Sequence, residues 1–562
     1  MPASMDRRRF ITWLSSAGLA AVAAPALVRG QPAEAVTDAA IAEAARLFGI
    51  TFTSAERELM LSGVKDHLEN YEALRALGIE NEVPPALTFS AALPEETVPA
   101  PGKRERPRTT PPRLRPGSTR GDAVAFLPLT ELGGLLRRGD VTSVELTRMY
   151  LRRLEQHDPR LRCVITLTAD RALRQARRAD DELQRGVDRG PLHGIPWGAK
   201  DLLAVRGYRT TWGAMPYKDQ IIDTDAEVVR RLDEAGAVLV AKLSVGALAW
   251  GDVWFDATTK NPWNLEQGSS GSSAGPAAAA VAGLVGFSIG TETLGSIISP
   301  SQRCGATGLR PTFGRVSRDG CMALSWSMDK IGPIGRSVED CALVFDAIHG
   351  ASGGDAAAVD APFAWDAARG LDGLRIGYQR AAFEEDTPDR ASDKAAVAAL
   401  RRMGVNLVPV TLPDLPSGDM LIILEAEAAA AFDRLTLGDG DDALVRQVEQ
   451  AWPNVFRSAR LIPAVEYIQA NRARTLLMRA FEEAVSEVDA FVHPTYAGGA
   501  LVAANLTGHP AVAVPNGFRA DGTPTSISFT GRRFREAELL STAKEYQDRT
   551  GFHRRHPPGF GV

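Results

Sequence analysis

Helical patterns and short apolar runs alternate along this chain from Leu127 onward. Thr142 and Glu145 form a capping-box pattern in front of a helical repeat of apolar residues. Residues 237–241 are a continuous apolar run after a glycine, which is typical of a buried strand. Such alternation predicts an α/β layer architecture with helices covering a mainly buried sheet. Further strands are predicted at residues 286–289, 490–493 and 511–514.

The composition is that of a soluble globular protein with a large core. The chain has 562 residues, of which 44% are hydrophobic and 24% are charged. A formal net charge of -5 gives no basic surplus and disfavours nucleic-acid partners. The four cysteines lack any CxxC spacing, so they suggest neither a zinc site nor a dithiol redox motif. One or two disulfides remain open if the chain is exported. These cysteines are Cys163, Cys304, Cys321 and Cys341.

The N-terminus, residues 1–30, has the pattern of an export signal. Three arginines at 7–9 precede an apolar stretch from Trp13 to Ala24, followed by small residues. This pattern resembles a twin-arginine signal, which implies a periplasmic or secreted protein. A permanent membrane anchor is the alternative, but the apolar run is too short to span a bilayer comfortably. We therefore expect no stable membrane insertion.

Two segments separate the signal from the main domain. Residues 31–100 are expected to form a helical extension, because apolar residues recur there at three- and four-residue steps. Residues 101–120 contain five prolines and seven Lys or Arg residues, a composition that resists both helix and sheet. We expect an extended linker lying over the body, although its basic residues could instead bind an acidic partner. Residues 121–562 would then form the main domain.

One lysine and two serines form the most informative set of residues. Both serines are predicted in glycine-rich loops and the lysine near the end of an element, positions from which a side chain can reach a substrate. A helix is predicted to begin near Pro276 and end near Gly283. Glycines beside the second serine allow backbone N–H groups to face a reacting carbonyl oxygen. The three residues are Lys200 in 194–201, Ser272 in 271–276 and Ser296 at the end of 290–296, with the two serines 24 positions apart.

A neutral lysine can act as the base in this set. A serine hydroxyl is a poor nucleophile unless a base removes its proton, and neither serine loop contains a histidine. Lowering a lysine pKa from about 10.4 to near 7 needs roughly 4 to 5 kcal/mol, which burial can supply. The apolar residues Ile195, Pro196 and Trp197 are suited to desolvating Lys200.

Over about residues 125–555 the chain resembles the amidase signature family. Residues 271–276 are similar to its Gly-Ser-Ser-Gly-Gly-Ser stretch, and residues 290–296 to its Gly-Thr-Asp-Thr-Gly-Gly-Ser stretch. The serine spacing and the Gly-Ile-Pro-x-x-x-Lys-Asp setting of Lys200 also agree. The resemblance implies a large mixed twisted sheet covered by helices on both faces. Supporting matches are residues 328–333, 336–340 and 505–510.

The resemblance also implies a mechanism. Neutral Lys200 would draw a proton through Ser272, whose peptide bond is cis in the family, while Ser296 attacks an amide or ester carbonyl and forms an acyl-enzyme. The substrate would be a small-molecule amide, and no metal or organic cofactor is expected. A homodimer is compatible with this interpretation. Backbone N–H groups expected to hold the oxyanion are those of Thr293, Leu294, Gly295 and Ser296.

The chain departs from the family pattern beside the nucleophile. Glu292 stands where the family usually has Asp, and Ile298 where it usually has Arg. An ion pair between those two positions cannot form, which leaves the pairing of Glu292 open, with Arg303 as one candidate partner. Pro276 in place of a serine is a milder change, because proline is favoured in the first helical turn.

Several other interpretations compete with this one. A phosphate-binding loop is disfavoured, because the glycine-rich stretch lacks a Gly-Lys-Ser/Thr ending. His493 and His509 could belong to a histidine triad, but without a Gly-x-Ser-x-Gly elbow we interpret them as packing residues. The chain could also be the amide-donor subunit of an amidotransferase, against which an export signal argues, or a catalytically silent periplasmic binding protein. Tryptophans that could line an acyl pocket or pack in the core are Trp250, Trp254 and Trp326.

Overall fold

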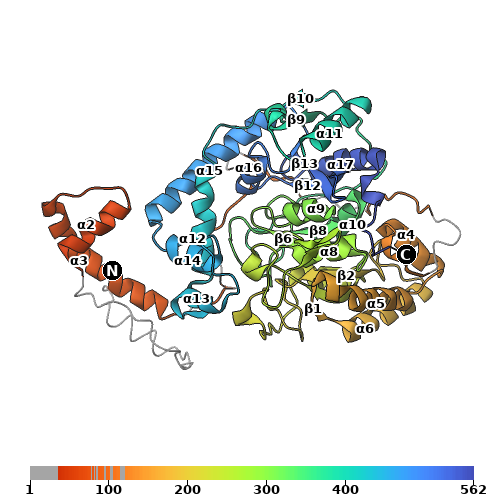
Figure 1. Cartoon of the computed structure of the whole chain (residues 1–562), viewed down its shortest axis with the longest axis horizontal. Helices are drawn as coiled ribbons and strands as arrows, with labels where there is room; N and C mark the ends of the chain where they lie inside the picture. Colours follow the sequence, from red (N-terminus) through yellow and green to blue (C-terminus); the bar gives the residue numbers. More distant parts are fainter. Residues whose placement is uncertain are drawn as a thin grey trace, which may run out of the picture. The chain divides into compact units, whose positions relative to one another are not determined.

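A computed structural model of the chain describes residues 36–77, 79–81, 83, 87–93, 96–100, 106–113 and 121–561. The predicted export signal, residues 1–30, lies outside the described residues, as do residues 101–105 and 114–120 of the predicted linker. The chain divides into two compact units (Figure 1). Among the described residues, those up to 79 together with 434–439 form the first unit, and those within 80–433 together with 440–561 form the second.

The first unit contains the helices that the N-terminal periodicity predicts. Helix α2 spans Asp38–Leu47 and α3 spans Ser54–Arg75. Thr37 caps α2 by accepting a hydrogen bond from the N–H of Ala40. Arg57 of α3 forms an ion pair with Asp38 of α2 at 2.9 Å, which joins the two helices. Among the described residues, no helix is both long and apolar enough to cross a bilayer.

The second unit is built on a mixed sheet of eleven described strands, in the order β1-β3-β2-β6-β8-β7-β12-β13-β11-β9-β10. Strand β2 runs parallel to both β3 and β6, whereas β6 pairs antiparallel with β8. A separate hairpin pairs β4 (Lys260–Asn261) with β5 (Asn264–Gly268). The sheet strands are β1 (Val164–Leu167), β2 (Pro196–Lys200), β3 (Val238–Leu243), β6 (Phe287–Glu292), β7 (Thr307–Arg310), β8 (Lys330–Gly335), β9 (Ile376–Tyr378), β10 (Val408–Pro409), β11 (Ala490–Pro494), β12 (Ala511–Phe518) and β13 (Pro524–Gly531).

Helices cover both faces of this sheet, because alternate residues of a strand point to opposite faces. In β3, Leu239 contributes to one buried core with residues of α4, α7 and α10, whereas Val238 and Val240 contribute to a second core with residues of α6 and α8. The predicted α/β architecture is therefore confirmed (Figure 1). All but the first residue of α13 (Asp433–Leu437) belong to the first unit. The helices of the second unit are α4 (Leu129–Arg138), α5 (Ser143–Leu161), α6 (Ala169–Gln184), α7 (Glu227–Glu234), α8 (Ala274–Val281), α9 (Ile298–Cys304), α10 (Val338–Ile348), α11 (Arg390–Arg402), α12 (Ile422–Ala431), α14 (Trp452–Ala459), α15 (Ala464–Val485), α16 (Ala500–Thr507) and α17 (Glu536–Thr550).

Local sequence signals account for several of these boundaries. Helix α5 begins with the predicted capping box, in which Thr142 and Glu145 each bond the backbone N–H of the other. Helix α8 begins at Ala274, two residues before the predicted start at Pro276. The predicted strands are present as β3, β6, β11 and β12, each extended beyond its apolar run.

Residues 106–113, which we call the strap, form no helix or strand and contact the rest of the second unit. Arg108 forms an isolated parallel β-bridge with Asp366. The N–H and hydroxyl of Thr110 each donate to Glu339 at 2.7 Å.

The structure decides a question about the cysteines that the sequence left open. All four are free thiols, and Cys163, Cys304 and Cys341 are buried. Burial raises the pKa of the Cys321 thiol to about 12, which keeps that thiol protonated at neutral pH. The disulfides left open by the sequence are therefore not formed.

Candidate active site

Lys200 is the last residue of β2, at the carboxyl edge of the parallel strands β2, β3 and β6. Its side chain is fully buried, and its flanking residues Ile195 and Trp197 are buried with it. The carboxylate of the next residue, Asp201, is already paired with Lys242 at 2.7 Å. Within the described chain, no carboxylate lies within 4 Å of the Lys200 amine.

The Lys200 amine is surrounded by neutral oxygens. Its Nζ lies 2.8 Å from Ser272 Oγ, 3.0 Å from Ser273 Oγ, 2.8 Å from Thr291 Oγ1 and 3.2 Å from the Thr291 carbonyl. The Ser273 hydroxyl donates to that same carbonyl at 3.1 Å, so its oxygen can accept from the amine. Burial lowers the pKa of Lys200 to about 7, against a weaker opposing effect of Cys321 and Asp329. A large fraction of this amine is therefore neutral at physiological pH.

Ser272 is held by a closely packed loop. The Gly271–Ser272 peptide bond is cis, as the family resemblance implies. The Ser272 carbonyl accepts from the N–H of Gly246 at 3.3 Å, and Asp252 accepts from the N–H of Ser270 at 3.0 Å. Ser270 has φ of 61°, an uncommon conformation for a residue with a side chain. These contacts fix the Ser272 hydroxyl against Lys200.

Ser296 lies in the turn between β6 and α9, beside the Ser272 loop. Its carbonyl accepts a 3.1 Å hydrogen bond from the N–H of Ser273, which joins the two serine-containing loops. Ser296 is 8% exposed as a residue, whereas Ser272 is 1% exposed. Of the two serines, Ser296 is thus the more accessible to a substrate, as a nucleophile must be.

The residues predicted to hold an oxyanion follow β6 directly. Residues 293–296 form a turn in which Gly295 has φ of 85°, a conformation that favours glycine. In the described structure, their backbone N–H groups donate to no protein acceptor. The turn is anchored at Thr293, whose hydroxyl donates to Asp329 at 2.6 Å and whose carbonyl accepts from Lys330 at 3.3 Å. Free N–H groups on an anchored turn can bind a developing negative charge.

Glu292 pairs with Arg310, and the predicted candidate Arg303 was wrong. The carboxylate lies 2.9 Å from the Arg310 guanidinium, and both groups are fully buried. Its other oxygen accepts from the N–H groups of Ile297 and Ile298, at 2.8 and 2.9 Å. Burial alone would raise the pKa of Glu292, but the charges of Arg310 and Lys330 outweigh it and lower that pKa to about 2. Glu292 is one methylene longer than the aspartate usual in the family. Its carboxylate thus links the backbone just after Ser296 to Arg310 of β7.

Sequence reasoning missed three side chains of this site. Ser273 and Thr291 contact the Lys200 amine, and Arg310 neutralises Glu292. The run of two serines at 272–273 was a usable signal for the first. No local signal identifies Arg310, because it comes from a strand that lies two places from β6 in the sheet.

The two histidines considered for a triad are buried away from Lys200. His493 contacts the Pro494 carbonyl and the Thr530 hydroxyl, both at 2.9 Å. His509 contacts the Thr507 hydroxyl at 2.7 Å and Glu482 at 3.4 Å. Burial lowers the pKa of each histidine to about 4. These contacts fit the packing role that we expected.

The tryptophans considered for an acyl pocket have structural contacts. Trp254 is buried and its indole donates to the Arg162 carbonyl at 3.3 Å. Trp250 stacks against the Arg446 guanidinium, 4.3 Å from its ring centre. Trp326 is partly buried, and its carbonyl accepts from Arg318 at 2.6 Å.

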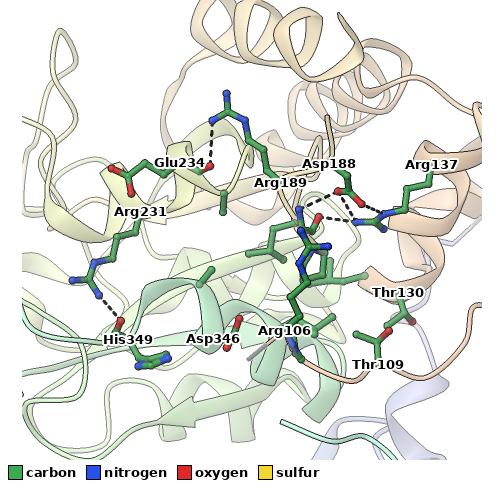
Figure 2. Close-up of a pocket in the computed structure, with 18 of the residues that line it drawn as sticks. Arg106, Thr109, Thr130, Arg137, Asp188, Arg189, Arg231, Glu234, Asp346 and His349 are labelled. Carbon is green, nitrogen blue, oxygen red and sulfur yellow. Dashed lines mark hydrogen bonds and ion pairs between the residues drawn. The ribbon is translucent and has the colours of Figure 1, made fainter. Parts of the chain in front are cut away.

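A cavity of about 890 Å³, which we call the rear pocket, lies away from these residues. It is bordered by the strap, α4, α7 and α10, and by residues 188–192 and 234–235, which lead into the amino ends of β2 and β3. Lys200 lies at the opposite end of β2, about 13 Å along the strand. Figure 2 shows Arg106 of the strap among the lining side chains, with Arg137 and Asp188 paired at 2.8 Å. Among the described residues, no group of three or more His, Cys, Asp or Glu side chains is arranged to hold a metal.

Comparison with known proteins identifies the family. Residues 145–540 match the Amidase family. The chain is 36% identical over 479 residues to a glutamyl-tRNA(Gln) amidotransferase subunit of Methylococcus capsulatus, covering 77% of this chain and 98% of that protein.

Solved structures agree with this assignment. The native peptide amidase of Stenotrophomonas maltophilia superimposes with a TM-score of 0.68 at 31% identity, covering 77% of this chain and 99% of that one. The corresponding glutamyl-tRNA(Gln) amidotransferase subunit of Thermotoga maritima gives a TM-score of 0.64 at 26% identity, covering 75% of this chain and 95% of that one. The chain therefore belongs to the amidase signature family.

Proposed function

We propose that this protein hydrolyses a carboxamide bond, and also esters, through an acyl-enzyme on Ser296. The observation that carries the proposal is the contact of a buried lysine with Ser272 at 2.8 Å, in the absence of any described carboxylate that would hold the lysine charged. A neutral amine can accept a proton from a hydroxyl, whereas an ammonium cannot. Family membership supports the same reaction class.

In the proposed first step, Ser296 Oγ bonds to the substrate carbonyl carbon. Its proton passes to Ser272 Oγ, while the proton of Ser272 passes to Lys200 Nζ. The carbonyl oxygen becomes an anion, which the N–H groups of residues 293–296 stabilise. Removing one such donor typically costs about 3 to 4 kcal/mol of transition-state stabilisation.

The second half of the reaction returns the protons. The carbon–nitrogen bond breaks, and the leaving amine takes the proton held on Lys200, relayed by Ser272. Water then attacks the acyl-enzyme and loses a proton by the same route. The carboxylic acid leaves, and Ser296 regains its hydroxyl.

Export is a separate part of the proposal. The arginine-rich start and apolar run within residues 1–30 support a twin-arginine signal and a periplasmic or secreted enzyme. Replacing Arg8 and Arg9 by lysine should leave the protein in the cytoplasm, as measured by cell fractionation. Unchanged export of that variant would contradict the assignment.

The similarity to amidotransferase subunits favours a second candidate function, amide donation within a complex. The two are separated by turnover of purified protein on a panel of carboxamides that differ in acyl and amine size. Sustained hydrolysis by the isolated chain, lost in Ser296→Ala, supports the amidase. Activity that appears only with added partner subunits supports the amidotransferase, and no activity with an intact fold supports a silent binding protein.

A further inference from the structure

Asn81 precedes the strap in the sequence and contacts a loop of the second unit, residues 321–325. Its side-chain amide donates to the Ala323 carbonyl at 2.8 Å and accepts from the Ala323 N–H at 2.9 Å. The amide also donates to the Ala431 carbonyl at 3.3 Å. One side chain thus bonds both backbone groups of a residue 242 positions away in the sequence.

On one side, the loop that Asn81 holds lies against the segment that follows Lys200. The N–H of Met322 donates to the Leu202 carbonyl at 3.1 Å, two residues beyond Lys200. Cys321 forms an isolated bridge with Leu203. Displacing this loop would therefore disturb the segment that follows the lysine.

On the other side, the same loop positions the oxyanion turn. The N–H groups of Leu324 and Ser325 donate to one oxygen of Asp329, at 2.8 and 3.0 Å. The other oxygen accepts from the Thr293 hydroxyl at 2.6 Å. Thr293 is the first residue of the turn whose N–H groups are proposed to bind the oxyanion. Hydrogen bonds therefore run from Asn81 through the loop and Asp329 to Thr293.

We propose that Asn81 is a positioning residue for the oxyanion turn. It fixes Ala323 and its neighbours, so that Asp329 holds Thr293 in the conformation that directs free N–H groups at the substrate. This inference rests on the proposed function and adds a residue from outside the segment that matches the Amidase family, which begins at residue 145. Because the oxyanion is fully developed only in the transition state, the role concerns kcat more than KM.

The rest of the segment is anchored independently of Asn81. Phe89 lies beneath the Arg474 guanidinium, 3.5 Å from its carbon, and packs edge-on against Phe313 at 5.0 Å. The Ala91 carbonyl accepts from Arg533. Truncating the Asn81 amide therefore removes its contacts to Ala323 without detaching the segment.

The test compares full-length Asn81→Ala, Asn81→Asp and the control Ser90→Ala, whose exposed hydroxyl only accepts from the nearby Ala92 N–H. Three quantities are measured for each: kcat and KM on a carboxamide turned over by the wild type, the rate of Ser296 labelling by a fluorophosphonate, and the thermal midpoint. Deleting an oxyanion donor outright lowers kcat about 10²- to 10³-fold, so displacing one should lower it by roughly 10-fold or more.

We expect Asn81→Ala to lose this factor in kcat and in labelling rate, with KM changed less than about twofold. Asn81→Asp should be intermediate, because its carboxylate can still accept from Ala323 N–H but cannot donate to the carbonyl. Ser90→Ala should match the wild type. A folded Asn81→Ala with wild-type kcat and labelling, or a loss that follows only the unfolded fraction, overturns the positioning role alone. A wild type that takes no label on Ser296 overturns this role and the proposed function together.

Discussion

Lys200 sets the pH dependence expected of this enzyme. Burial lowers its pKa to about 7, and only the neutral amine can accept the serine proton. We therefore expect kcat/KM to rise about tenfold per pH unit below 7 and to level off above it. A rate profile that is flat from about pH 5 to 9 would show that Lys200 is not the titrating base. Lys200→Ala, measured alongside, should be inactive across that range.

The buried ion pair of Glu292 with Arg310 should contribute to the stability of the fold. Glu292→Gln would leave Arg310 buried without a counter-charge, and breaking a buried pair in this way costs about 3 to 5 kcal/mol of unfolding free energy. Denaturant unfolding at pH 7 measures this loss. Glu266→Gln, at an exposed position, is the control and should change stability little.

The stabilisation that the Glu292–Arg310 pair contributes should be lost at low pH. The folded pKa of Glu292 is lowered to about 2, below its ordinary value of about 4.5, so its charge stabilises the fold above about 4.5. That contribution is lost as the pH falls toward 2. The stability difference between wild type and Glu292→Gln should shrink over this range, and a difference that stays constant would contradict the pairing.

Sequence motifs named Lys200, Ser272 and Ser296 as candidates, and the structure brings Lys200 and Ser272 into contact, but the motifs did not identify the ion pair of Glu292. Lys200, Ser272 and Ser296 each lie in a contiguous motif with a fixed spacing, and local motifs carry that information. The partner of Glu292 depends on sheet order, which places β7 two strands from β6 with β8 between them. Local sequence contains no signal for such an arrangement.

Strand β6 extends beyond the end that its apolar run predicts. The apolar run suggests a strand ending at residue 289, whereas β6 continues through Thr291 to Glu292. Pairing with β8 extends it, since Thr291 lies opposite Ile331 and Glu292 opposite Lys330. Long-range pairing and buried charge neutralisation stabilise polar residues in a strand, and both lie outside the reach of a local pattern.

The close packing of the loop that carries Ser272 can be tested at Gly271. A Cβ added at Gly271 would lie 1.7 Å from the Gly251 carbonyl oxygen, so Gly271→Ala must displace the loop. We expect loss of turnover and a fall of about 1 to 3 kcal/mol in unfolding free energy. Gly353→Ala, where a Cβ meets nothing within 4 Å, is the matched control. Full activity of Gly271→Ala would show that this close packing does not position Ser272.

For the whole molecule, composition predicted an extended strap but not its location. Five prolines in residues 101–120 disfavour regular structure, and the described residues 106–113 form no helix or strand. Its partners Asp366 and Glu339 are more than 200 residues away in sequence. Which surface an extended segment covers is set by the folded body, so composition cannot supply it.

The four free cysteines allow a prediction about how the thermal stability of the protein responds to reductant. Because no disulfide joins the four thiols, reductant should leave the thermal midpoint and the activity unchanged. A disulfide typically contributes about 2 to 4 kcal/mol, so its reduction would lower the midpoint by several degrees. Thermal unfolding with and without dithiothreitol measures this. A fall in the midpoint with reductant would reveal a bond between two cysteines.

The claim on which this account depends is that Ser296 is a nucleophile activated by neutral Lys200 through Ser272. Fluorophosphonate labelling followed by peptide mass mapping tests it most directly, because it requires no knowledge of the substrate. We expect one adduct, on Ser296, which forms faster as the pH rises through about 7 and is nearly abolished in Lys200→Ala. An adduct on another residue, or undiminished labelling of Ser296 in folded Lys200→Ala, would contradict the account.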